Sequence, residues 1–251
     1  MPSRIHAKNT DIYVDEFDFG GVTNRAEISI DNPTPEVTAF NDGDATYVEG
    51  KPTFTFNIQG LHSTATPNYD GEMFTDLTSE ARRVGIYPNQ AAVGERGYEG
   101  DCNISDEPII TRLQEAIALN VTWQGDTPVL RAQVLYKNAA VAASENGTAY
   151  QTGSVSATQK VVGILRLLSA PGGAGTNTCD VVVASDDAQG FVSGVTRLTF
   201  TQLNQASVAL HEVQSANGAI TDTWWRVQVT IAGTGSRTFD LLVVIGITAQ
   251  P

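Results

Sequence analysis

Histidine, cysteine and the usual catalytic signatures are scarce in this sequence. It has three His and two Cys among 251 residues, and no G-x-S-x-G, P-loop or G-x-G-x-x-G motif follows an apolar run. Base-activated Ser or Cys nucleophiles depend on a partner that is most often His. The three histidines, His6, His62 and His211, are far apart, and we interpret each as structural. The sequence therefore predicts a protein that is not an enzyme and needs no cofactor.

The two cysteines carry little information about metal or redox chemistry. Cys102 and Cys179 lack a CxxC spacing and a companion His, which argues against a zinc site and a redox motif. We expect two buried free thiols, and a disulfide between them stays open.

Positive charge is also in short supply. Lys and Arg number 15 against 28 Asp and Glu, so the formal net charge is −13. Such a chain is repelled by phosphate, which disfavours gripping of nucleic acid and binding to anionic membranes. Low Lys with abundant Asp leaves a high-salt habitat open.

Long apolar runs are missing too. None approaches the ~20 residues of a membrane span, and the first residues have no apolar core of a secretory signal. We therefore expect no membrane partner and assembly in the cytoplasm of the producing cell.

Short segments with alternating apolar side chains dominate what is present. In 53–58 (TFTFNI), Phe54 and Phe56 face one way while the threonines face the other, which is typical of a strand with one packed face. Turn residues separate such segments. The predicted strands are 12–14, 25–30, 35–40, 53–58, 102–106, 116–124, 128–136, 160–170, 179–187, 196–203, 224–233 and 237–249.

One helix is expected within 72–87, near 73–84. Phe74, Leu77 and Ala81 share a face there, and Gly85 would end the helix. The small, polar stretch 137–153 predicts a linker or long loop. The sequence thus predicts a β unit over 1–136 that includes the helix, and a second β unit over 154–251.

Clustered acids raise two other possibilities. Asp15, Glu16 and Asp18 form one group, and the neighbours Asp186 and Asp187 would point to opposite faces of a strand. The third group, Asp42, Asp44 and Glu49, could hold calcium, but it lacks the full alternating ligand loop, so a calcium site is disfavoured.

Trp224 and Trp225 are candidate sugar platforms. Neighbours in a strand face opposite ways, so one is expected in the core and the other exposed or at an interface. We favour a core and interface role for the aromatic residues Phe40, Phe54, Phe56, Trp224 and Trp225.

Two segments of the region 11–60 are distinctive, IYVDEFDFGGVTNRAEIS at 12–29 and PEVTAFNDGDATYVEGKPTFTFNIQG at 35–60. Through them the region resembles the opening of tail tube proteins from long-tailed viruses of bacteria and archaea. The residues that match the family's strand end and following turn are Val37, Thr38, Ala39, Phe40, Asp42, Glu49, Gly50 and Lys51.

The second half resembles the same family through the order of its segments. These are GSVSATQKVVGILRLL, VVVASDDAQGFVSGVTRLTF and ITDTWWRVQVTIAGTGSRTFDLLVVIGI. The resemblance implies a mainly β fold, a sandwich or barrel of the tail-tube type with one short flanking helix. Whether it has one β unit or two stays open.

The resemblance further implies a structural virion protein of the tail tube. Subunits would join edge to edge into rings of three or six, which stack into the conduit for genome DNA. The DNA would pass without specific binding, and other tail proteins would be partners. The loop expected between rings contains Asn41, Asp42, Gly43, Asp44, Tyr47, Glu49 and Lys51.

Two alternatives remain. One is another virion component, such as a tail terminator or a capsid decoration protein. The other is a carbohydrate-binding or receptor-binding β-sandwich.

Overall fold

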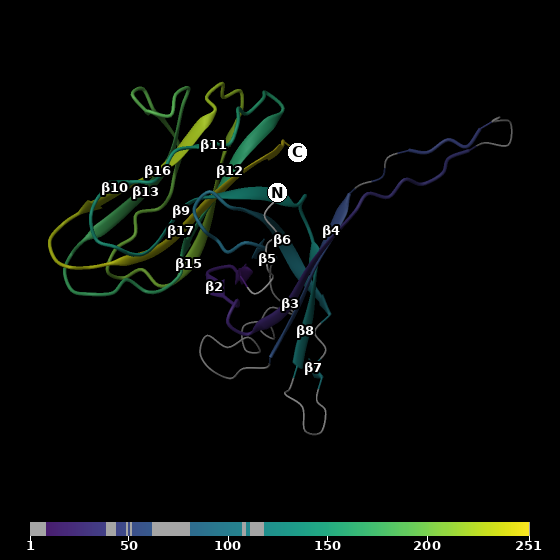
Figure 1. Ribbon diagram of the computed structural model, residues 1–251, viewed down its shortest axis with the longest axis horizontal. Helices are drawn as coiled ribbons and strands as arrows, with labels where there is room; N and C mark the ends of the chain where they lie inside the picture. The colour runs from purple at the N-terminus through teal and green to yellow at the C-terminus, as the bar shows by residue number, and fades with distance from the viewer. Residues whose placement is uncertain are drawn as a thin grey trace, which may run out of the picture. The chain divides into compact units, whose positions relative to one another are not determined.

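The computed structural model describes residues 9–38, 44–48, 50, 52–61, 81–106, 109–110 and 118–250 (Figure 1). The chain forms two compact units. Unit 1 comprises Met1–Gly20, Gly85–Glu99 and Leu130–Pro251, and unit 2 comprises Gly21–Val84 and Gly100–Val129. The predicted border at 137–153 differs from this division, because the chain enters unit 2 twice before residue 130.

Every regular element of the described residues is a strand. Those of unit 1 are β1 (Asp11–Val14), β2 (Phe17–Asp18), β9 (Leu130–Val141), β10 (Glu145–Asn146), β11 (Tyr150–Gln151), β12 (Gln159–Leu167), β13 (Thr178–Asp186), β14 (Val195–Thr199), β15 (Leu210–Asn217), β16 (Trp224–Ala232) and β17 (Phe239–Ala249). Those of unit 2 are β3 (Thr23–Asp31), β4 (Thr53–Leu61), β7 (Ile109–Ile110) and β8 (Ala118–Gly125). Two strands, β5 (Arg82–Tyr87) and β6 (Arg96–Asp106), contribute residues to both units. The prediction of a mainly β fold is confirmed.

Unit 1 is built as a sandwich. Its larger sheet runs in the order β15-β12-β17-β9-β6-β5-β1-β2, and a second sheet runs β10-β16-β13-β14, with β11 also paired to β16 (Figure 1). Alternate side chains of β9, β12 and β17 pack against β13 and β16, and Trp225, Val183 and Val243 lie in this core. Burial of these side chains removes apolar surface from water, which is the main stabilising term.

The opposite face of the larger sheet is covered as well. Tyr13 of β1 and Tyr87 of β5 belong to a second core together with Ile164 of β12 and Val244 of β17. The two tyrosine rings meet edge to face, with centroids 5.9 Å apart. The sheet therefore curls into a half-barrel, and its central strands are buried on both faces.

Unit 2 contains the antiparallel series β3-β4-β8, and β8 also pairs with β7 and with the end of β6. In β4 the buried residues alternate with less buried ones, as the sequence predicts for 53–58. Phe54 and Phe56 are buried and contact each other in a T-shaped arrangement at 5.2 Å. One face of this sheet is therefore apolar and the other polar.

The predicted helix near 73–84 is wrong in its C-terminal part. From Arg82 the chain is strand β5, and there is no helix among the described residues, while 73–80 lie outside them. Val84, Gly85, Ile86 and Tyr87 are all buried. A strand buried on both faces shows no alternation, so its short apolar run is hard to distinguish from a helix.

Residues 137–153 are also more regular than a linker. β9 continues to Val141, and the short strands β10 and β11 both pair with β16. The stretch therefore joins the two sheets of the sandwich instead of separating two halves.

Candidate functional site

A two-stranded arm extends beyond β3 and β4 in unit 2 (Figure 1). Backbone N–H groups donate across it from Val37 to the Thr46 carbonyl at 2.8 Å and from Val48 to the Pro35 carbonyl at 3.1 Å. Near its base the Gly50 N–H donates to the Pro33 carbonyl at 2.7 Å. Residues 31–35 (DNPTP) therefore continue from the end of β3 into one side of a long hairpin, in which Glu36 lies opposite Tyr47.

The arm exposes large apolar side chains. Val37 is 50% exposed, Tyr47 61% and Val48 46%, and Ile30 at the end of β3 is also exposed. The register places Val37 and Val48 on one face and Tyr47 on the other. A lone two-stranded hairpin is marginally stable in water, and exposed apolar surface of this kind marks an interaction site.

Most residues predicted for the inter-ring loop lie outside the described part of the chain. Those outside are Asn41, Asp42, Gly43, Glu49 and Lys51, together with the aromatic Phe40. Asp44 and Tyr47 are described and exposed, and both lie on the second strand of the arm. Asp42 and Glu49 lie outside the described residues, so the expectation that Asp42, Asp44 and Glu49 do not form a calcium site stays a prediction.

The two tryptophans differ in environment. Trp225 is fully buried, and its Nε1–H donates to the Gly153 carbonyl at 2.8 Å. Trp224 is half-buried at the start of β16, opposite Gln151 of β11. They do not form a pair of exposed aromatic platforms, which a sugar-binding face would need.

Two long strands have one unpaired edge among the strands that the structure describes. β15 pairs with β12 alone in unit 1, and β3 pairs with β4 alone in unit 2. Each edge presents a row of N–H and C=O groups that another strand can pair with. The exposed residues Val213 and Ser215 lie along β15.

The polar face of unit 2 carries mainly neutral side chains. Cross-strand rows can be followed over β3, β4 and β8, and they consist of Arg25, Gln59 and Asn120; Glu27, Asn57 and Thr122; and Ser29, Thr55 and Gln124. The Thr122 hydroxyl donates to Asn57 Oδ1 at 2.8 Å, and Arg25 pairs with Glu27 at 2.9 Å. Amides and hydroxyls dominate these rows, and Arg25, the one positively charged residue in them, pairs with Glu27.

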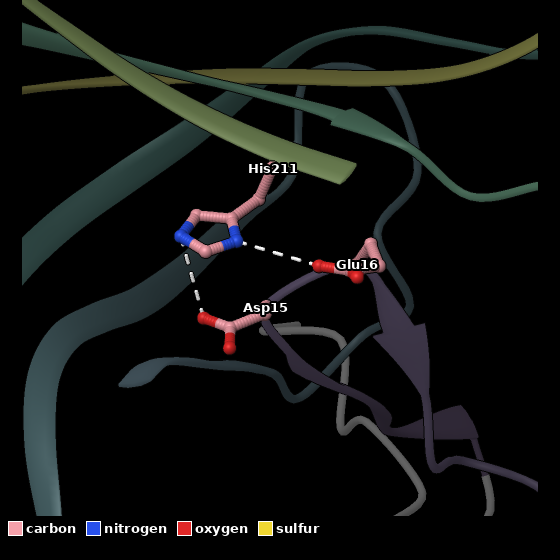
Figure 2. Close-up of side chains that lie close together, drawn as sticks. All are labelled: Asp15, Glu16 and His211. Atoms are coloured by element: carbon pink, nitrogen blue, oxygen red, sulfur yellow. Dashed lines mark hydrogen bonds and ion pairs between the residues drawn. The ribbon is translucent and has the colours of Figure 1, made fainter. Parts of the chain in front are cut away.

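A histidine and two carboxylates converge within unit 1 (Figure 2). Asp15 and Glu16 form the turn between β1 and β2, and His211 comes from β15. His211 Nε2 lies 3.4 Å from Asp15 Oδ1, and Nδ1 lies 3.4 Å from Glu16 Oε2. The Asp15 side chain is fully buried, whereas those of Glu16 and His211 are 17% and 32% exposed.

A buried ion pair lies next to this cluster. Arg166, directly opposite His211 in the β12–β15 register, donates from Nη1 and Nη2 to the two carboxylate oxygens of Glu99 at 2.8 and 2.9 Å. Its Nε also donates to the Asp15 carbonyl, and the Tyr87 hydroxyl donates to Glu99. Burial alone would lower the pKa of Arg166, but Glu99, with Tyr87 and Asp15, more than offsets this and the pKa is raised.

A second polar group lies at the end of β13. Asp222 accepts from the Ser185 hydroxyl at 2.6 Å and from Arg197 at 3.0 Å, and these two bonds lower its pKa. The pKa of Asp187 is raised because its carboxyl shares a hydrogen bond with Asp186 and is repelled by the negative charge of Asp186. Asp186 also accepts from the Ala188 and Ser193 N–H groups, and these bonds stabilise the connection between β13 and β14.

Both cysteines are buried free thiols. Burial, followed by the charge of Asp180, raises the pKa of Cys179 to about 12, so this sulfur carries little thiolate at neutral pH.

The histidine–carboxylate cluster was missed by sequence reasoning. The sequence groups Asp15 and Glu16 as acids, but His211 is 195 residues from Glu16 and lies between the strands predicted at 196–203 and 224–233. Residues of β15 alternate between half-buried and exposed, but the letters LHEVQSAN show little apolar alternation. No local sequence pattern therefore indicates that His211 lies near the turn formed by Asp15 and Glu16.

No protein-family model matches the sequence, and no curated protein matches it either. Solved structures with a similar arrangement include a protein in the virion of a native gene transfer agent particle. That match has a TM-score of 0.40 and 12% identity, and covers 51% of this chain and 98% of the other. A protein of the PVC extracellular contractile injection system sheath–tube complex matches with a TM-score of 0.42 and 11% identity, over 52% of this chain and 93% of the other.

A further likeness extends over nearly the whole chain. The Dit protein of phage SPP1, described as a hub of the adsorption apparatus, matches with a TM-score of 0.40 and 8% identity, covering 95% of this chain and 99% of its own. These neighbours belong to a virion particle, a sheath–tube complex and a phage adsorption apparatus. All three TM-scores are below 0.5, and the likenesses do not assign a function to this chain.

No helix among the described residues has the length and apolar character needed to cross a bilayer.

Proposed function

We propose that this chain is a structural protein of a viral tail, which assembles with copies of itself into rings that stack as the tail tube. The observation that carries the proposal is the combination of two unpaired strand edges with an exposed apolar arm. Ring closure pairs edges that would otherwise promote uncontrolled association. Rings of three or six copies satisfy this requirement.

The arm supplies the contact between rings. Its apolar side chains are exposed in the described part of the chain and gain burial against another molecule, and a second copy is always available in a homo-oligomer. Other tail proteins at the two ends of the tube are the remaining partners.

The proposal assigns the lining of the bore to the polar face of unit 2. The central strands of the larger sheet in unit 1 are buried on both faces and offer no open surface, in contrast to β3, β4 and β8. A lining of amides and hydroxyls, in a chain of net charge −13, gives passing duplex DNA few cations to bind. The role is structural and includes no catalysis, and its place is the virion after assembly in the host cytoplasm.

Substitution of the β15 edge tests ring formation. Val213→Lys with Ser215→Lys places two charges on the edge strand while keeping its pairing with β12 and the side chains of Leu210 and Ala216, which pack against the core. We expect folded protein that no longer closes rings, as measured by light scattering after size exclusion. A matched variant, Val192→Lys with Val208→Lys, adds the same charge at exposed loop positions and should assemble as wild type. Unchanged rings in the edge variant would remove β15 from the interface.

A further inference from the structure

We propose that Asp15, Glu16 and His211 form a binding site for a divalent first-row transition ion, for which Zn²⁺ is the appropriate probe. One potential ligand atom from each residue lies within 4.8 Å of the other two. The two carboxylates come from the two residues of one turn, and the imidazole comes from a strand that is remote in sequence (Figure 2). The site is independent of the proposed tail function.

The three groups are close enough to converge on one ion. Both nitrogen–oxygen distances are 3.4 Å, but they start from different ring nitrogens, since Nε2 faces Asp15 and Nδ1 faces Glu16. A bound ion takes one nitrogen, and one potential ligand atom of each residue lies within 4.8 Å of the other two. Ligands of a tetrahedral Zn²⁺ at about 2.0–2.1 Å are about 3.4 Å apart, so binding requires a small turn of the imidazole about its Cβ–Cγ torsion, whose preferred range is broad.

The local charge also suits a divalent ion. Asp15 and Glu16 place two carboxylates next to each other in one turn, while Arg166 nearby bonds both oxygens of Glu99 and also interacts with the charge of Asp15. A divalent ion with a neutral imidazole would bring positive charge to the side of the turn that His211 faces.

The surrounding residues fix the three ligands and leave the site accessible to solvent. The Arg166 Nε–H donates to the Asp15 carbonyl and fixes the turn, as hydrogen bonds to the ligands do around known metal sites. Glu16 and His211 are partly exposed, so an ion can enter and water can complete its coordination.

The mixed ligand set selects the class of ion. Imidazole with carboxylates suits Zn²⁺ and its first-row neighbours, whereas Ca²⁺ and Mg²⁺ prefer a larger set of oxygen ligands. Once bound, the ion ties the β1–β2 turn to β15, joining the start of the chain to an edge strand.

Calorimetric titration of the full chain with ZnCl₂ at neutral pH tests the site. We expect saturable binding of one ion per chain, and an affinity at least ten-fold lower in His211→Asn and in Glu16→Gln. His62→Asn removes a different imidazole and should bind as wild type. Zn²⁺ should raise the midpoint of thermal unfolding of wild type and of His62→Asn alone, and Mg²⁺ should raise neither.

Several outcomes would overturn the assignment. They are the absence of saturable binding by wild type, wild-type affinity in His211→Asn, an equal effect of Mg²⁺, or loss of binding in His62→Asn. Should His211→Asn fail to fold, Glu16→Gln decides alone, because Glu16 lies in a turn and its charge is partly exposed. Slower amide exchange at Glu16 and Phe17 on addition of Zn²⁺ would locate the ion at the turn.

Discussion

Arg166 and Glu99 face each other as a two-bond ion pair with both side chains fully buried in unit 1. The pair joins β12 to β6, and through the Asp15 carbonyl it also holds the turn that follows β1. Such a pair contributes little net stability compared with apolar residues, but removal of one partner leaves an uncompensated buried charge.

The first prediction concerns this pair. Arg166→Met should lower the free energy of unfolding by about 3–5 kcal/mol, because the buried Glu99 then loses the positive charge that compensates it. Adding Glu99→Gln to that variant should restore part of the loss. Urea unfolding of both single variants and the double variant measures the coupling. Arg25→Met, which breaks the exposed pair with Glu27, is the control and should cost under about 1 kcal/mol. Additive costs at Arg166 and Glu99 would contradict the account.

The second prediction concerns close packing in unit 2. Gly125 and Gly100 lie against the ring of Phe54, and a Cβ at either position would overlap it. Gly125→Ala should therefore destabilise the protein by about 1–3 kcal/mol through overpacking. In a Phe54→Leu background the same substitution should cost less, because the ring is gone. Gly21→Ala, where a Cβ meets nothing within 4 Å, is the control. Equal costs in both backgrounds would show that Phe54 is not the obstacle.

A third prediction follows from the buried phenols. Burial, and then the charge of Asp18, raises the pKa of Tyr13 to about 12, and the pKa of Tyr87 is also raised by burial and by Glu99. The folded protein thus holds these protons more tightly than the unfolded chain does. Their contribution to stability is complete below pH about 10 and is lost as the pH rises from there toward about 12.

Urea midpoints between pH 8 and pH 12 measure this effect. The midpoint should fall above pH about 10, and Tyr13→Phe should flatten part of that fall, since one titrating group is removed. An identical slope in Tyr13→Phe would mean that Tyr13 ionises equally in both states.

The fourth prediction separates assembly from folding. Val37→Asp with Tyr47→Asp puts charge on both faces of the arm and should abolish stacking while rings still form. Val192→Asp, at a position 95% exposed in a loop of unit 1, is the control and should leave stacking intact. Electron micrographs that show full-length tubes from the arm variant would exclude the arm from the contact between rings.

Strands with one wet face were predictable from the sequence. The letters TFTFNI gave the location of β4 and the side on which Phe54 and Phe56 are buried, because alternation reports directly on a two-faced sheet. Strands without such alternation could not be predicted in the same way. β5 is buried on both sides and was mistaken for a helix, and β15 is an edge strand whose letters are largely polar.

The start of β6 shows a further limit. The sequence predicts this strand only from residue 102, yet β6 begins at Arg96, and Gly97 and Gly100 lie within it. The Tyr87 ring occupies the space beside Gly97, and the Phe54 ring that beside Gly100. Glycine in a strand often marks such close approach, but only the tertiary contact distinguishes it from a turn. The cluster of Asp15, Glu16 and His211 depends in the same way on a contact that spans 195 residues.

Negative-stain electron microscopy of the purified protein over a concentration series tests the central claim most directly. The account predicts closed rings at low concentration and hollow tubes of uniform diameter at high concentration, with three-fold or six-fold symmetry in end views. A protein that remains monomeric throughout, or that binds glycans as a discrete monomer, would contradict a self-assembling tail tube.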